Sequence, residues 1–258
     1  MKIHLGKIDK FYNSRLGGYV VDSLRPAIAG MIDIPTNNSK TCIISASAFA
    51  FINIFKNMKR LSLQAFHAQE TWPAEGQGHY VVAERKQWPY RAEEVDYVVM
   101  VHDLEFAEDP DQYLREAWRV LKGEGRLVIV FPNRAGKWAR FDTTPFGLGY
   151  PYTLEQMDKL LSAAHFSIDK VEPRLFHSPV TPETWVGEWG RSFIEKIGLY
   201  CLLQPGVYCV CASKHIYAPT RGLGATTAEK AKQALFPKPA ATTPRGLNNN
   251  IKECKTRV

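Results

Sequence analysis

The stretch Glu94–Asn133, EVDYVVMVHDLEFAEDPDQYLREAWRVLKGEGRLVIVFPN, has the pattern of a strand, a helix and a second strand. Val95–Val101 is an unbroken, valine-rich apolar run, which predicts a strand buried on both faces of a parallel sheet. Pro110 suits the first turn of a helix, and apolar side chains recur at helical spacing up to Leu121. Arg126–Phe131 predicts the second strand, and because a helix separates the two strands, we expect them to be parallel.

The same stretch resembles the class I S-adenosylmethionine (SAM)-dependent methyltransferases of the type 11 group. The matching positions are Asp96, Glu108–Pro110, Glu116, Arg119–Leu121, Gly125 and Pro132–Asn133. Phe106 and Glu124 depart from the family pattern, which has histidine and glycine there in many members. The resemblance implies an α/β fold with a doubly wound, mostly parallel seven-stranded sheet and helices on both faces. Glu116 and Arg119 are expected only to place charge on the surface of a helix.

The rest of the chain continues the alternation of strands and helices without an internal repeat, which is typical of a doubly wound sheet. A short helical pattern begins near Tyr12 and is interrupted at Gly17, Gly18 and Pro26. A helical insertion is predicted around 183–197. Further strands are predicted at 42–45, 61–66, 80–83, 166–171 and 207–214, and helices at about 51–58 and 154–163.

The sequence predicts three segments. We expect residues 1–34 to form an N-terminal helical lid segment and residues 35–217 the Rossmann-like methyltransferase domain. Residues 218–258 are expected to be a basic, disordered tail, because they have too few apolar side chains for a core. The formal net charge is +7, and nine Lys or Arg against two Glu from Lys214 onward account for all of it. The body is therefore neutral, which gives no support for a nucleic-acid groove.

Cysteine usage and the absence of targeting patterns favour a cytoplasmic protein. The five cysteines show no CxxC spacing, and their odd number does not suggest a disulfide framework. Cys209 and Cys211 are two positions apart in a predicted strand, so both are expected to pack on one face rather than to bind a metal. No metal site is predicted, the N-terminus lacks the apolar core of a signal peptide, and no apolar stretch is long enough to span a membrane.

The resemblance implies a SAM site at the carboxyl ends of the strands. After the first strand the family has an acidic residue and a GxGxG turn, and these positions are Ile44, Ala46, Ala48 and Ala50 here. Alanine penalises any positive φ and crowds a ligand that approaches the backbone. The candidates for cofactor binding are Ser45, Ala46, Ser47, Ala48, His67, Glu84, Arg85, Lys86, Trp88 and Val101.

His102 and Asp103 follow the fourth predicted strand and are the candidate catalytic residues, because either side chain could act as a general base. Residues 134–152 predict a long surface loop that resembles the W-R-D-TPFG segment of the family. The candidates for acceptor binding are Tyr12, Trp138, Arg140 and Phe146. For Tyr12, His102 and Asp103 a second interpretation stays open, in which they only pack or form hydrogen bonds within their own segments.

Three functions remain open. The first is a SAM-dependent methyltransferase that acts on an unidentified small-molecule or protein acceptor. The second is a catalytically inactive methyltransferase-like protein with a binding or regulatory role. This alternative is favoured because the family's glycine turn is missing, and so is the carboxylate that normally holds the SAM ribose after the second strand. The third, a nicotinamide-dependent reductase on a similar sheet, is disfavoured because none of the 11 tyrosines has a lysine four residues later. No oligomeric state is predicted.

Overall fold

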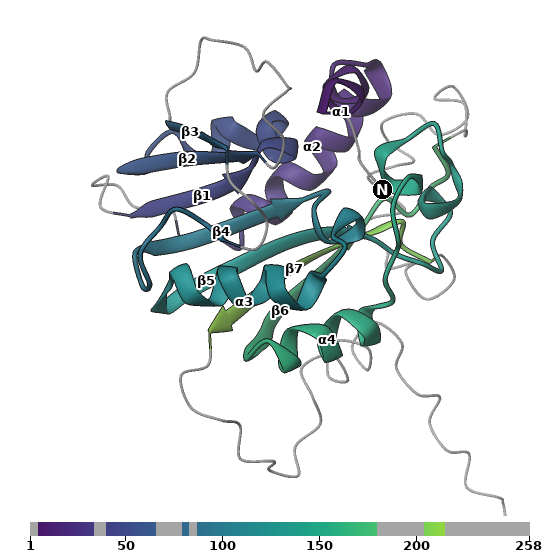
Figure 1. The fold of residues 1–258 in the computed structure, drawn as a ribbon. Helices are drawn as coiled ribbons and strands as arrows, with labels where there is room; N and C mark the ends of the chain where they lie inside the picture. Colours follow the sequence, from purple (N-terminus) through teal and green to yellow (C-terminus); the bar gives the residue numbers. More distant parts are fainter. Residues whose placement is uncertain (1–4, 34–39, 66–78, 83–86, 180–203, 215–258) are drawn as a thin grey trace, which may run out of the picture.

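A computed structural model describes residues 5–33, 40–65, 79–82, 87–179 and 204–214 of the chain (Figure 1). The helical insertion predicted at 183–197 and the predicted tail at 218–258 lie outside these described residues. The elements are α1 (Leu5–Tyr12), α2 (Arg15–Ala29), β1 (Thr41–Ser45), η1 (Ala46–Phe55), β2 (Arg60–Ala65), β3 (His79–Val82), β4 (Val95–Val101), η2 (Leu104–Phe106), α3 (Pro110–Val120), β5 (Leu121–Pro132), η3 (Trp138–Arg140), η4 (Pro145–Gly147), α4 (Leu154–Ala163), β6 (Phe166–Arg174) and β7 (Val207–Lys214), where η marks a 3-10 helix.

The described strands form one seven-stranded sheet in the order β3-β2-β1-β4-β5-β7-β6. The five strands from β3 to β5 are parallel, and β7 pairs antiparallel with both β5 and β6. The packing of α1, α2 and η1 covers one face of the sheet, and α3 and α4 lie on the other (Figure 1). The predicted doubly wound, mostly parallel seven-stranded sheet is therefore confirmed.

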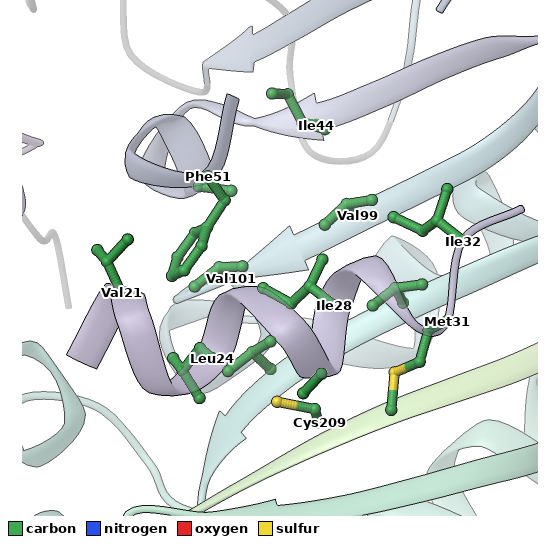
Figure 2. Packing of buried hydrophobic residues seen from close by; sticks show 14 of the residues in the cluster. Val21, Leu24, Ile28, Met31, Ile32, Ile44, Phe51, Val99, Val101 and Cys209 are labelled. Atoms are coloured by element: carbon green, nitrogen blue, oxygen red, sulfur yellow. The ribbon is translucent and has the colours of Figure 1, made fainter. Parts of the chain in front are cut away.

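Helix α2 packs on the sheet and buries one of its faces in the hydrophobic core. Figure 2 shows Ile28 of α2 pointing toward Val99 and Val101 of β4, and these three side chains and Leu24 are all buried. The predicted interruption of this helix at Gly17, Gly18 and Pro26 is wrong, since α2 runs through all three residues. Packing of an amphipathic face stabilises a helix more than residue propensity does, which explains the difference. The division between residues 1–34 and 35–217 stays a prediction.

On the opposite face, α3 buries Tyr113, Leu114, Ala117 and Val120, as its spacing predicts. Two boundaries differ from the sequence-based expectation. Strand β5, the second strand of the Glu94–Asn133 stretch, begins at Leu121 instead of Arg126, because the glycines after Leu121 continue the strand. The helix predicted at 51–58 is instead the 3-10 helix η1 at Ala46–Phe55.

Cys209 and Cys211 lie in β7 and belong to the same buried cluster as α2, so the prediction that they pack on one face is confirmed. Burial raises the pKa of Cys209 to about 12 and that of Cys211 to about 11. Both thiols are therefore protonated at neutral pH and act as small apolar side chains.

The matching residue Asp96 has a structural role at the edge of β4. Its carboxylate accepts hydrogen bonds from Thr41 N at 2.8 Å and from Lys122 Nζ at 2.9 Å, so it joins the starts of β1, β4 and β5. Burial alone would raise the pKa of Asp96, but the bonds from Thr41 and Lys122 together lower it. A lowered pKa means that the charged form stabilises the fold.

We expect Asp96→Asn to lower the free energy of unfolding by about 1–2 kcal/mol at pH 7. The expected loss is this small because the Asp96–Lys122 ion pair is partly exposed to solvent, which screens its charges. Because the folded-state pKa is depressed, this contribution is present above the unfolded value of about 3.9 and is lost as pH falls through the folded value. Urea denaturation at several pH values measures it, with the exposed Asp22→Asn as control. A difference between Asp96→Asn and wild type that grows as pH falls would contradict this role.

Candidate functional site at the switch point of the sheet

The strand order reverses between β1 and β4, because the chain continues from β1 to β2 on one side and from β4 to β5 on the other. In open α/β sheets, ligands bind outside the carboxyl ends of the strands at such a switch point. β1 ends at Ser45 and β4 ends at Val101. The residues that follow these two strands therefore make up the candidate site.

Two serine hydroxyls join the ends of these strands. Ser45 Oγ accepts a hydrogen bond from Val101 N at 3.1 Å. The Ser47 hydroxyl donates to the carbonyl oxygen of Val101 and lies 3.1 Å from Ser45 Oγ. Both serine side chains are buried. The structure thus brings together the predicted cofactor residues Ser45, Ser47 and Val101, but their polar atoms bond to one another.

The segment that replaces the expected glycine turn is helical. β1 passes directly into η1, and Ala48 and Phe51 of η1 are fully buried. Among the described residues, the non-glycine positions with positive φ are Glu93, His102, His165 and Leu175. The penalty that alanine would meet at a positive φ therefore does not arise at Ala46, Ala48 and Ala50, because η1 uses right-handed backbone that alanine adopts freely. The departure from the family lies in the shape of this segment and not in strain.

His102 links helix α1 to the end of β4 through a chain of buried hydrogen bonds. The Tyr12 hydroxyl lies 2.7 Å from His102 Nε2, and His102 Nδ1 lies 3.1 Å from Glu105 Oε1. When Glu105 is a carboxylate it can only accept, so Nδ1 of His102 then donates to it, and in the neutral imidazole Nε2 is the acceptor for the Tyr12 hydroxyl. We name this chain of three side chains the Tyr12–His102–Glu105 relay.

Burial, and after it the negative charge of Glu105, raise the pKa of Tyr12 well above its ordinary value. The phenol therefore stays protonated and can donate to His102. Glu105 itself is 1% exposed, and its Oε2 has no hydrogen-bond partner within the described part of the chain. Gly149 packs directly on this side chain, because a Cβ at Gly149 would lie 2.7 Å from Glu105 Cγ. Glu105 was not among the residues singled out from the sequence.

Asp103, the other candidate catalytic residue, is buried at the start of η2, and its carbonyl oxygen accepts a hydrogen bond from Phe106 N at 3.1 Å. The segment from His102 to Phe106, which connects β4 to α3, is therefore buried. The catalytic roles of His102 and Asp103 stay predictions.

The predicted surface loop at 134–152 contributes two large aromatic side chains to the core. Trp138 and Phe146 are fully buried, and their ring centroids lie 5.5 Å apart at 88°. Phe146 also packs on the His102 ring, with centroids 4.5 Å apart. Arg140 in η3 is exposed. The structure thus brings Tyr12, His102 and Phe146 together through ring contacts, while Arg140 lies at the surface.

Trp88 lies in the core on the opposite face of the sheet, where its ring packs on Tyr113 with centroids 5.5 Å apart. Glu116 accepts a hydrogen bond from Trp88 N, and Arg119 donates to the carbonyl oxygens of Trp88 and Tyr90. The expectation that Glu116 and Arg119 only charge a helix surface is therefore wrong, because they hold the segment before β4. The remaining cofactor candidates, His67, Glu84, Arg85 and Lys86, lie outside the described residues.

A pocket of about 320 Å³ opens between α1, α2 and η1. Tyr12 and Ser47 line it, together with the apolar side chains of Ile8 and Val21. Its polar lining comes from Asp9, Asn13, Asp22, Arg25 and Asn53. Tyr12 thus borders this pocket on one side and reaches His102 with its hydroxyl on the other.

The contact between α1 and α2 depends on Gly17. A Cβ at Gly17 would lie 1.9 Å from the carbonyl oxygen of Phe11 and 2.5 Å from Tyr12 Cα, whereas a Cβ at Gly18 would meet nothing within 4 Å. We expect Gly17→Ala to displace α1 and Tyr12 and to cost about 1–3 kcal/mol of stability. The matched control Gly18→Ala should stabilise the helix by up to about 1 kcal/mol. Equal stabilities of the two variants in urea denaturation would argue against this packing of α1.

Among the described residues, no group of three or more His, Cys, Asp or Glu side chains could hold a metal ion. Nor does any helix in the described ranges have the length and apolar character needed to cross a membrane. The predicted cytoplasmic location stays a prediction.

The sheet order, with its switch point between β1 and β4, is that of the fold found in class I SAM-dependent methyltransferases. Residues 38–129 match the family model of the type 11 methyltransferase domain, so the resemblance inferred from the sequence is confirmed. The matched segment contains β1 to β4, α3 and most of β5. It therefore includes both sides of the switch point.

Three solved structures share this fold. A chain of the complex between the Haloferax volcanii Trm112 methyltransferase activator and a methyltransferase is 13% identical, with a TM-score of 0.57 over 83% of this chain and 100% of that one. A SAM-dependent methyltransferase from Archaeoglobus fulgidus is 19% identical, with a TM-score of 0.54 over 80% and 97%. The [4+2]-cyclase SpnF is 15% identical, with a TM-score of 0.51 over 75% and 81%. The fold alone therefore does not fix the reaction.

A curated relative, an uncharacterized protein of Methanocaldococcus jannaschii, is 39% identical over 54 residues, which are 21% of this chain. The match spans 26% of that protein, about a quarter of its length.

Proposed function

We propose that this protein is a SAM-dependent methyltransferase that acts on an acceptor at the β1–β4 switch point. The observation that supports the proposal most is the match of the methyltransferase domain to residues 38–129, which includes His102. His102 follows β4, and its Nδ1 lies 3.1 Å from Glu105 Oε1, so its Nε2 would be left to accept a proton from a methyl acceptor once the Tyr12 hydroxyl has withdrawn. A small molecule or a protein is the proposed acceptor.

In the arrangement described, the residues at the switch point do not fit SAM. Ser45 and Ser47 bond to Val101, and Tyr12 packs on Phe51 with ring centroids 5.7 Å apart, so side chains of the protein fill this place. Of these side chains, Tyr12 comes from the first described helix and not from the sheet or η1. SAM binding therefore requires at least that α1 withdraws Tyr12.

The same closed arrangement favours a second candidate, a methyltransferase-like protein without catalytic activity that binds or regulates a partner. Within the described residues, η1 packs as a helix where the family has a glycine turn, and Ala48 and Phe51 have no exposed surface. A protein of this kind would keep the fold and would have no measurable affinity for SAM.

Calorimetric titration with SAM separates the two candidates. For a methyltransferase in which Tyr12 must move, Tyr12→Ala should bind SAM at least about tenfold more tightly than wild type, because the cost of withdrawing the ring is removed. Tyr208→Ala is the matched control, since Tyr208 is a buried tyrosine on the opposite face of the sheet. Circular dichroism checks the fold of each variant. Absence of SAM binding by all three folded proteins would exclude the methyltransferase and leave the non-catalytic candidate.

A further inference from the structure

The pocket of about 320 Å³ between α1, α2 and η1 is already open, unlike the switch point beside it. Its floor is apolar, because the side chains of Ile8, Tyr12 and Val21 line it and are each 8% exposed or less. The partly buried side chains of Phe49 and Ile52 in η1 add apolar surface. Ligand pockets with mostly apolar lining start at about 300 Å³, so this one has room for a small organic molecule.

Gly18 of α2 leaves space at this pocket. It lines the pocket, and a Cβ at this position would meet nothing within 4 Å. Glycine inside a helix is unfavourable relative to alanine. The close contact between α1 and α2 accounts for the neighbouring Gly17, where a Cβ would lie 1.9 Å from the carbonyl oxygen of Phe11, but it does not account for Gly18. What Gly18 contributes is open space at the pocket.

The rim of the pocket has an unbalanced negative charge. The charged residues that line it are Asp9, Asp22 and Arg25, and neither lysine of α1 does so. Asp22 lies 3.6 Å from Arg25, so these two charges form a pair. Asp9 accepts a hydrogen bond from the side-chain amide of Asn13 at 3.1 Å and forms no ion pair with another described residue. The carboxylate of Asp9 therefore has a neutral donor but no cation beside the pocket.

We infer that this pocket binds a small organic cation, in which an ammonium group is attached to an apolar body. The ammonium group lies at the rim beside Asp9, and the apolar body packs on Ile8 and Val21 at the floor. An anionic ligand is disfavoured, because Arg25 is already paired and Asp9 would repel a second negative charge. This inference goes beyond the proposed function, since the binding requires neither SAM nor a movement of Tyr12.

The test uses the full wild-type chain and three probes that share an indole ring. At neutral pH tryptamine is a cation, tryptophol is neutral and indole-3-propionate is an anion. Tryptamine should bind about three- to fivefold more tightly than tryptophol, because an ion pair at an exposed rim adds no more than this. Indole-3-propionate should bind more weakly than tryptophol, and added salt should reduce both differences. Changes in the amide NMR shifts of the protein should concentrate in α1, α2 and η1.

Gly18→Leu tests the place of binding. Leucine is favourable in a helix, and its side chain would extend from the open position at the pocket, so the variant should fold and lose at least about tenfold in tryptamine affinity. Gly6→Leu is the matched control, because Gly6 lies in α1, also has open space at its Cβ and does not line the pocket. It should bind tryptamine as wild type does. Circular dichroism checks the fold of both variants.

Asp9→Asn tests the charge, since it keeps the shape of the side chain. It should reduce the preference for tryptamine over tryptophol to less than about twofold. Asp111→Asn makes the same change at an exposed carboxylate in the first turn of α3, on the opposite face of the sheet, and should keep the wild-type preference.

Absence of tryptamine binding by the wild-type protein would overturn the inference, and so would equal binding of the three probes. Amide shifts that change mainly outside α1, α2 and η1 would do the same, as would a Gly18→Leu variant that binds tryptamine as tightly as Gly6→Leu. The wild-type shifts locate the site without relying on any variant. None of these titrations contains SAM, so failure of the proposed function would show separately.

Discussion

Ile44→Asp is expected to prevent the protein from folding. Ile44 lies in β1 at 0% exposure, within the apolar cluster that includes Ile28 and Val99 (Figure 2). An isolated carboxylate there lacks a partner and would cost roughly 3–5 kcal/mol or more, a large part of a total stability of about 5–15 kcal/mol. Circular dichroism and thermal unfolding measure the loss.

Ile44→Val is the control for this position, and it should cost only about 0.5–1.5 kcal/mol because it removes one methylene group. The result matters for the cofactor question, since family resemblance places an acidic residue at Ile44. A folded Ile44→Asp variant with nearly wild-type melting would mean that this position reaches solvent or a ligand. Restoring the family's acid here is otherwise no route to tighter SAM binding.

Trp138→Ala is expected to cost about 3–5 kcal/mol of stability, because it removes a large buried ring and leaves a cavity. Trp138 Nε1 donates to the carbonyl oxygen of His177 at 2.7 Å, and its ring packs on Phe146. Gly206, just before β7, packs against the same ring, since a Cβ there would lie 2.2 Å from Trp138 Cδ1. The tryptophan thus joins three segments that are distant in the sequence.

The exposed Arg140→Ala, in the same 3-10 turn, is the control and should change stability by less than about 0.5 kcal/mol. Urea denaturation compares the two variants. If Trp138→Ala kept wild-type stability and lost only ligand binding, the ring would belong to an acceptor pocket and not to the core.

The strands were predictable because burial on both faces requires continuous apolar runs. β4 and β7 have the predicted bounds, β1 begins one residue earlier than predicted, and β2 is shifted by one residue toward the N-terminus. The parallel pairing of β4 and β5 followed from the helix between them. In these elements local pattern and tertiary packing favour the same structure.

The segment after β1 could not be predicted from a motif defined by glycine. ASAFAFINIF has no glycine to permit a left-handed turn, and the chain instead continues as the 3-10 helix η1. Apolar side chains at most of its positions make this outcome favourable, since Ala48, Phe51 and Phe55 all enter the core. Aligning these residues with the family's glycine turn does not reveal that the backbone here forms a 3-10 helix instead of a turn.

The site itself was only partly predictable. His102 and Tyr12 were each singled out, but they are 90 positions apart, and their hydrogen bond depends on how α1 crosses the switch point. Glu105 was missed because an acidic residue in a loop gives no sign of burial. The spacing of His102 and Glu105, three positions apart, was the one available signal for their contact.

The place of β7 in the sheet bears on how the chain folds during synthesis. β7 pairs with β5 and β6 on its two sides, although it is the last described strand and starts at Val207, long after β6 ends at Arg174. Until the ribosome has released residues 207–214, β5 and β6 both present unpaired backbone edges, which are templates for pairing with other nascent chains. A chain truncated before Val207 would keep both edges open, so premature termination should produce aggregates rather than a smaller folded domain.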